Sequence, residues 1–314
     1  MEKRIGPNKW IWHQLNTNEL DRIKLNINDD RDIRNKWLEQ ILENRSNFLR
    51  IDLLDNGERV VQGSLIYKQN FENELEYEIC HYYVTNDLLV TVDLELSSLK
   101  HIDPEFILKE INQTENAVDG FLIFLGELMN EMLFEIDQFE DALKTLIWSV
   151  RKRNETIILE KIYTRRHELL VWKSLLIPIK ELKMGIEEAN FNEVCSGDIF
   201  TRTLRRIERA TALLNEYEHE IDSIIKLEEV ISSHRGNEIM KTLTVITIIF
   251  TPVMALGALW GMNFKNMPEL KWKYGYLLSI LLIILSTFML YGYLKLKGWT
   301  GDLLKGKKKG SFFK

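Results

Sequence analysis

Two uncharged stretches in the last quarter of the chain decide what kind of protein this is. Residues 242–264 read TLTVITIIFTPVMALGALWGMNF and residues 274–294 read YGYLLSILLIILSTFMLYGYL, without a Lys, Arg, Asp or Glu. Each exceeds the roughly 20 apolar residues that an α-helix needs to cross a bilayer core. The sequence therefore predicts two transmembrane helices. The second stretch is too uniformly apolar to be an amphipathic helix of a soluble protein.

Basic residues around the two stretches predict their orientation. The connecting loop 265–273 carries three lysines, whereas the tail 295–314 carries seven, and Arg235 and Lys241 precede the first stretch. Cytoplasmic flanks are enriched in Lys and Arg. We therefore expect both termini in the cytoplasm, the loop with Glu269 outside, and the basic tail against anionic lipid headgroups.

Charge also separates the rest of the chain from its membrane part. Residues 236–314 carry a net charge of +8, and since the whole chain carries −6, residues 1–235 carry −14. An acidic domain attracts cations, whereas a nucleic-acid-binding protein would present a basic face. The two cysteines form no CxxC pair, no catalytic arrangement is evident, and the polar residues 1–7 predict no signal peptide. We expect neither an enzyme nor an organic cofactor.

The first 115 residues have the pattern of a mixed α/β domain. Asp55-Asn56-Gly57 separates two apolar runs and predicts a hairpin, since Asn-Gly accepts positive φ. A helix is expected over 30–44, with Ile33, Trp37, Ile41 and Leu42 on one face. The remaining runs extend the prediction to a sheet of at least four strands, over 10–15, 48–54, 60–67, 75–84 and 88–94.

Long helical patterns follow the sheet. Apolar residues recur at helical spacing over 117–152 and 156–184, and again from Phe200 onward. A helix running unbroken from there to Trp260 would be about 90 Å long, which predicts a stalk leading into the membrane. The predicted organisation is a sheet domain over 1–115, long helices over 116–198, a stalk helix over 199–241, a first transmembrane helix over 242–264, an external loop over 265–273, a second transmembrane helix over 274–294 and a basic tail over 295–314.

A polar stripe distinguishes the first transmembrane stretch from the second. Steps of three and four residues place its members on one helix face: Asn237, Met240, Thr244, Thr247, Thr251, Met254 and Ala258. Small and polar residues in a membrane helix permit close packing against neighbouring helices, which is the commoner explanation. They also suit the lining of a water-filled pore. The spacing Gly257-xxx-Gly261 is interpreted as a packing motif.

The residues flanking the first stretch carry a family resemblance. Residues 237–241 (NEIMK), 260–264 (WGMNF) and 266–272 (NMPELKW), in this order around a membrane helix, resemble the CorA family of divalent-cation channels. The resemblance is firm over residues 237–299. Upstream, the resemblance consists of the order of sheet, long helices and stalk, and of Arg165-Arg166, Leu169-Leu170 and Pro178.

This resemblance implies a funnel-shaped homopentamer in a bacterial plasma membrane. The first transmembrane helix of each subunit would line a central pore, with Gly261-Met262-Asn263 as the selectivity filter and Asn263 contacting hydrated Mg²⁺. Magnesium would be both the transported ion and a regulatory ligand. The resemblance adds Leu243 to the pore-facing positions. The other positions that it implies belong to the polar stripe, and this overlap favours a pore lining over helix packing as the role of the stripe. The predicted pore-lining residues are Asn237, Met240, Leu243, Thr244, Thr247, Thr251, Met254 and Ala258.

The chain departs from the family pattern at a few positions, and other functions remain open. Trp260 replaces a usual Tyr, Thr251 and Met254 stand where Met and then Thr are common, and Lys226 occupies a position that is acidic in some members. One alternative is a transporter of the same architecture for zinc, cobalt or nickel, although Met262 favours magnesium. The other is a membrane-anchored sensor or scaffold without flux.

Overall fold

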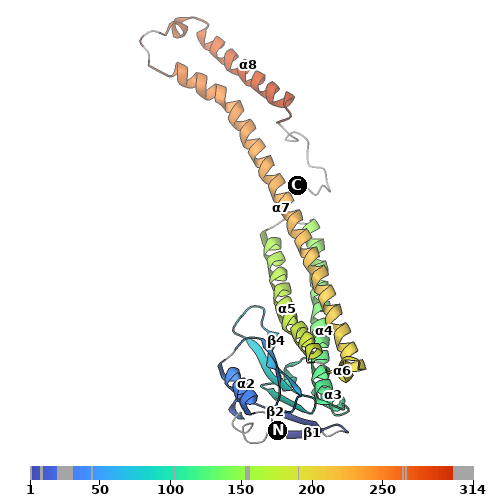
Figure 1. Ribbon diagram of the computed structural model, residues 1–314. Coiled ribbons are helices and arrows are strands. Elements are labelled where there is room, and N and C mark those ends of the chain that lie inside the picture. The colour runs from blue at the N-terminus through green and yellow to red at the C-terminus, as the bar shows by residue number, and fades with distance from the viewer. Residues whose placement is uncertain are drawn as a thin grey trace. The chain divides into compact units, whose positions relative to one another are not determined.

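The chain folds into two compact units, Met1–Asp222 and Ser223–Lys314. The computed structural model (Figure 1) describes residues 2–7, 10–19, 31–43, 45–101, 103–152, 156–189, 191–263, 265 and 267–299. The first unit contains a sheet and the long helices, and the second contains the end of one of these helices and the helix that follows it.

A six-stranded mixed sheet forms the centre of the first unit. Its strands are β1 (Glu2–Ile5), β2 (Trp10–Leu15), β3 (Phe48–Leu53), β4 (Arg59–Gln69), β5 (Tyr77–Val84) and β6 (Leu88–Val92), in the spatial order β1-β2-β6-β5-β4-β3. The five predicted strands are confirmed, and β1 is additional. Its sequence EKRI has too few apolar residues to show an alternation. β2 and β6 pair in parallel, and the other neighbours are antiparallel.

The predicted hairpin joins β3 to β4. Gly57 has φ of +85°, which a residue without a Cβ adopts at little cost. Its N–H donates to the carbonyl of Leu54 (2.9 Å), and the Leu54 N–H donates to the carbonyl of Glu58 (2.8 Å). The Asn56 side chain accepts from the Glu58 N–H at 2.9 Å. The turn residues therefore make the hydrogen bonds that their sequence predicts.

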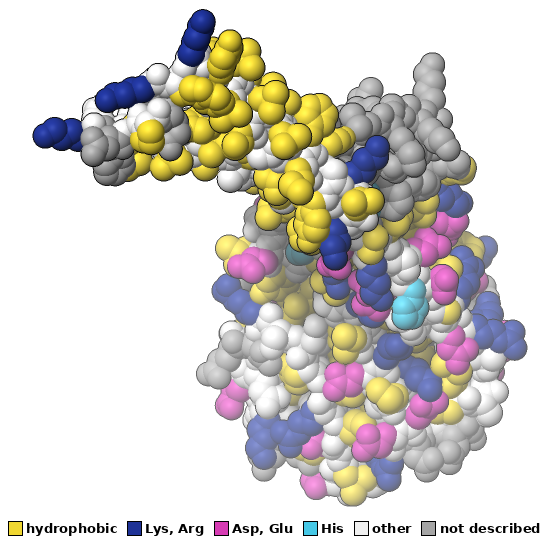
Figure 2. Space-filling view, turned by 90° about the horizontal axis from the view of Figure 1, so that it is seen from above, with side chains coloured by type: hydrophobic (Ala, Val, Ile, Leu, Met, Phe, Trp, Pro, Cys, Tyr) yellow, Lys and Arg dark blue, Asp and Glu magenta, His cyan; other side chains and the backbone are white. Residues whose placement is uncertain are grey.

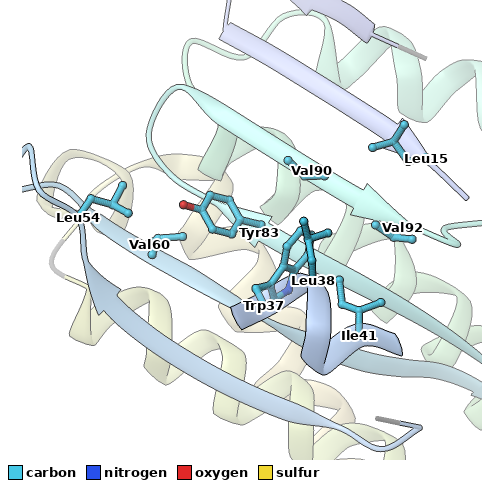
Figure 3. Packing of buried hydrophobic residues seen from close by; sticks show 9 residues of the cluster. All are labelled: Leu15, Trp37, Leu38, Ile41, Leu54, Val60, Tyr83, Val90 and Val92. Atoms are coloured by element: carbon cyan, nitrogen blue, oxygen red, sulfur yellow. The ribbon is translucent and has the colours of Figure 1, made fainter. Parts of the chain in front are cut away.

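Helix α2 (Arg31–Glu43) covers one face of the sheet through Trp37 (Figure 3). This side chain is fully buried, and its ring centroid lies 5.4 Å from that of Tyr83. The prediction was correct for Trp37 and Ile41 but wrong for Leu42, which is 65% exposed; Leu38 is buried instead. Nine buried residues make up this cluster: Leu15, Trp37, Leu38, Ile41, Leu54, Val60, Tyr83, Val90 and Val92.

Long helices cover the opposite face of the sheet (Figure 1). They are α4 (Ala117–Lys152) and α5 (Thr156–Glu188), with the short α3 (Pro104–Ile111) packed beside α4. Tyr82, the neighbour of Tyr83, lies with its ring centroid 5.2 Å from that of Phe121 on α4. Successive residues of a strand point to opposite faces, so these two tyrosines join the sheet to both helical layers.

Helix α7 (Asp198–Trp260) follows the short α6 (Asn192–Cys195) and continues for 63 residues without a break. The prediction of a helix that runs unbroken to Trp260 is thereby confirmed. Its first 25 residues, Asp198–Asp222, belong to the first unit, where polar contacts hold them to α4 and α5. Arg206 pairs with Glu127 at 3.0 Å, and the Tyr217 hydroxyl donates to Glu140 at 2.8 Å. Lys173 of α5 pairs with Glu218 at 2.7 Å.

A buried histidine makes the stability of the first unit depend on pH. His81 in β5 is 4% exposed, and its Nδ1 lies in hydrogen-bond contact with the Ser64 hydroxyl on β4. Burial lowers the pKa of the imidazole, and the nearby Asp93 carboxylate raises it by less. The folded protein therefore keeps His81 neutral at a pH where the unfolded chain, with an ordinary pKa of about 6.5, takes up a proton.

We expect stability to be fully present above about pH 6.5 and to fall as the pH drops from there toward the lowered pKa of His81. His81→Gln should flatten this slope. Thermal unfolding of the full-length protein in detergent between pH 5 and 8 measures it, with the exposed His219→Gln as the control. Parallel pH profiles of His81→Gln and the wild type would contradict the prediction.

Candidate ion-conduction site

Two helices of the second unit are long and apolar enough to cross a membrane. They are the C-terminal part of α7 and α8 (Gly275–Leu296). The loop between them contains the short helix η3 (Pro268–Lys271), which includes the backbone of Glu269. Hydrophobic side chains gather over the two apolar helices of this unit, with basic side chains at the end of the region (Figure 2). Helix α7 ends at Trp260, so Gly261-Met262-Asn263 lies outside the helix rather than within its last turn.

The polar stripe is bare along its whole length. All seven of its members are exposed in the single chain, including Met240 at 62% and Met254 at 59%. Leu243, which the family resemblance adds to the stripe, is 57% exposed. The structure therefore brings the predicted pore-lining residues together on one surface of α7, and this surface is not packed closely against any other described part of the chain.

The less exposed residues of the same helix segment form a second stripe on the opposite face. They also recur at steps of three and four, with Val245 at 8% exposure: Thr242, Val245, Ile249, Pro252 and Leu256. The chain thus uses the opposite face of α7 for its own packing. If the polar stripe serves packing, its partner is not among the described residues of this chain.

Threonine hydroxyls give the polar stripe a defined hydrogen-bonding polarity. Thr244 donates to the carbonyl of Met240 at 2.8 Å, Thr247 to that of Leu243 at 2.9 Å, and Thr251 to that of Thr247 at 2.7 Å. A hydroxyl has one proton and two lone pairs, so each oxygen still offers an acceptor after this donation. Water around a cation presents its protons outward, which matches a row of acceptors.

The loop after α7 exposes the predicted filter residues. Gly261, Met262 and Asn263 are all exposed, and the Gly261 N–H still donates to the carbonyl of Gly257 at 2.9 Å. A Cβ at Gly261 would lie 3.0 Å from that carbonyl oxygen, so a larger side chain would crowd the end of the helix. A Cβ at Gly257 would meet nothing within 4 Å, so the predicted packing at Gly257-xxx-Gly261 has no partner inside the described chain.

The described residues of the single chain form no cluster of acidic or imidazole side chains for the predicted regulatory magnesium. Among the described residues, no group of three or more His, Cys, Asp or Glu side chains is placed to hold a metal. Cys80 is buried, which raises the pKa of its thiol to about 12 and keeps it protonated.

Comparison with known proteins identifies similar sequences and a similar fold. The sequence profile of a family described as "CorA-like Mg2+ transporter protein" matches residues 8–296. A "Magnesium transport protein CorA" of Bacillus subtilis (strain 168) is 40% identical over 301 residues, covering 96% of this chain and 94% of the relative. A "Cobalt/magnesium transport protein CorA" of Thermotoga maritima is 22% identical over 269 residues, covering 80% of this chain and 72% of the relative.

A solved structure agrees in fold. The complete structure of the CorA magnesium transporter from Methanocaldococcus jannaschii superposes with a TM-score of 0.64 at 16% identity, covering 95% of this chain and 94% of that one. The predicted fold class, an α+β domain joined by a long helix to two apolar C-terminal helices, is confirmed.

Proposed function

Because this chain belongs to the CorA-like Mg²⁺ transporter family, we propose that it carries hydrated Mg²⁺ into the cytoplasm through a pore lined by α7 from five identical subunits. The observation that carries the proposal is the bare polar stripe of α7, which leads to Gly261-Met262-Asn263 while the opposite face of the helix is partly buried. A shared axis through five subunits would give the exposed stripe a role that no contact among the described residues of one chain provides.

Asn263 is assigned the role of filter. Magnesium releases its water reluctantly and prefers octahedral oxygen ligands. A ring of five carboxamide oxygens accepts hydrogen bonds from the water shell and selects the ion without stripping it. Since the oxygens are neutral, the ion is held weakly enough to leave, which conduction requires.

The threonines continue this chemistry through the bilayer. Their free lone pairs accept from the same water shell at Thr251, Thr247 and Thr244 in turn. A passing anion would present lone pairs to lone pairs, which disfavours it. Met240 and Leu243 lie near the cytoplasmic end of the span and can close the path by dewetting when the subunits approach each other.

The membrane potential is assigned as the driving force. Moving one charge through 100 mV is worth about 2.3 kcal/mol, so a divalent cation gains about 4.6 kcal/mol. This accumulates magnesium without ATP. We place the protein in the bacterial plasma membrane with both termini in the cytoplasm, where the acidic residues 1–235 attract cations and bind regulatory Mg²⁺ between subunits.

Two alternatives compete with this function. The name of the Thermotoga relative includes cobalt, so a related metal is a second candidate substrate. A sensor or scaffold without flux is the alternative from a different class, and it would use the polar stripe only for contact between subunits.

Ion flux into liposomes distinguishes these functions. The purified protein is reconstituted around a magnesium-sensitive dye, and an inside-negative potential is imposed with a potassium gradient and valinomycin. We expect magnesium entry that disappears without the potential and is absent from protein-free vesicles. Entry of cobalt, nickel or zinc without magnesium would favour the related metal, and no flux of any of these ions by an intact oligomer would favour the scaffold.

A further inference from the structure

The polar stripe continues beyond Asn237 toward the N-terminal end of α7. The same steps of three and four lead back from Asn237 to Ser233, Val230, Lys226 and Ser223. From Ser223 to Ala258 the extended stripe has eleven positions, and Lys226 is the only one with a charged side chain. A single basic residue in an otherwise neutral row is unexpected on a surface that cations are to follow.

The structure leaves this extension as bare as the transmembrane part. Lys226 is exposed, and Val230 is 58% exposed. The buried residues of this segment lie on the other side of the helix, with Ile224 at 8%, Glu228 at 6% and Ile231 at 3% exposure. Within the described part of the chain no ion pair joins Lys226 to a carboxylate, although Glu229 is exposed nearby on the helix.

We propose that Lys226 is a rate-limiting positive charge on the cytoplasmic part of the conduction path, so that removing this charge speeds up cation flux. The inference rests on the proposed function, because only an assembly around the polar stripe turns one lysine into a ring of ammonium groups. This ring lies on the cytoplasmic side of Met240 and Leu243, where cations that have crossed the membrane would leave.

Electrostatics gives the direction and the salt dependence of the effect. Charges of one sign gathered around a path change the local concentration of ions and their rates by about 10- to 1,000-fold. Five lysines repel a divalent cation, and the exposed Glu229 carboxylates offset part of this repulsion. The Debye length falls from about 10 Å at 0.1 M salt to about 3 Å at 1 M, so the repulsion should weaken as salt is raised.

The test uses initial rates of magnesium entry into liposomes for the full-length wild type and four variants. Lys226→Gln removes the charge, Lys226→Glu reverses it, and Lys226→Arg keeps it. Arg235→Gln is the matched control, because nine residues at 100° each place Arg235 on the opposite side of the helix from Lys226. Each variant is measured at about 20 mM and about 500 mM monovalent salt, below and above the range where screening sets in.

At low salt we expect Lys226→Gln to be about 3- to 10-fold faster than the wild type, which is at or just below the lower limit of the range for clustered charges because Glu229 offsets part of the repulsion. Lys226→Glu should be faster still. Lys226→Arg and Arg235→Gln should stay within about twofold of the wild type, and high salt should reduce the differences. Unchanged rates in both Lys226→Gln and Lys226→Glu, with a conducting wild type, would overturn the inference. A rise in Lys226→Arg equal to that in Lys226→Gln would do the same, because shape would then matter rather than charge. A wild type that does not conduct would refute the proposed function instead.

Discussion

Substituting Asn263 by Ala is expected to reduce potential-driven magnesium uptake by about tenfold or more. Each hydrogen bond contributes about 0.5–1.5 kcal/mol net, and all five subunits of the proposed pore would lose one acceptor at the same level. The side chain is exposed in the single chain, beyond the end of α7, so its removal leaves no cavity in the fold. Initial rates of dye-reported magnesium entry into liposomes measure the effect.

A matched control separates a lost filter from a damaged membrane domain. Ser279→Ala also removes a small polar group in the second unit, but on α8, where the Ser279 hydroxyl donates to the carbonyl of Tyr276 at 2.8 Å. It should conduct like the wild type. Size-exclusion chromatography in detergent checks that both variants assemble. If Asn263→Ala assembles and conducts within twofold of the wild type, Asn263 is not the filter.

Trp37→Ala is expected to destabilise the first unit by about 3–5 kcal/mol, the usual cost of removing a large aromatic side chain from a core. Trp37 is fully buried between α2 and the sheet and lies in contact with Tyr83 (Figure 3). For a unit of this size the loss corresponds to a decrease in Tm of roughly 6–20 °C. Far-UV circular dichroism of the full-length protein in detergent measures it.

Two further substitutions test whether packing is the cause. Leu42→Ala changes the same helix at a side chain that is 65% exposed, and it should cost less than about 0.5 kcal/mol. Trp37→Phe keeps an aromatic ring and removes an indole N–H that is buried without a hydrogen-bond partner among the described residues. It should therefore cost much less than Trp37→Ala. Equal losses in Trp37→Ala and Leu42→Ala would show that α2 contributes little to the core.

Features set by neighbouring residues in the chain were predictable. The Asp55-Asn56-Gly57 turn depends on one residue that accepts a positive φ, and Gly57 adopts a positive φ in the structure. The two apolar stretches depend on length and composition, and both are helical over nearly their whole extent. Periodicity also places the polar stripe on one face of α7, because a regular helix repeats every 3.6 residues wherever it stands.

Features set by contacts between distant segments were not predictable in the same way. β1 is too short and too polar to be identified before its partner β2 is known, and the parallel pairing of β2 with β6 joins strands far apart in the sequence. Leu38 and Leu42 are both apolar residues of α2, yet one is buried and the other exposed. Periodicity shows roughly which face of α2 is apolar. The position of the sheet decides which of these apolar residues is buried.

The helix face that carries the proposed function has one property that the sequence predicts and one that only the tertiary structure decides. Sequence alone was sufficient to find two membrane-crossing helices and a polar stripe on the first, because these follow from composition and from helix geometry. It left open whether the stripe is packed or bare. That depends on which face of α7 the rest of the chain covers, and burial is a property of three-dimensional contacts. In the folded chain, Val245 and Pro252 on the opposite face are buried while the stripe from Asn237 to Ala258 stays exposed, so the surface left for ions or for another subunit became visible only in the structure.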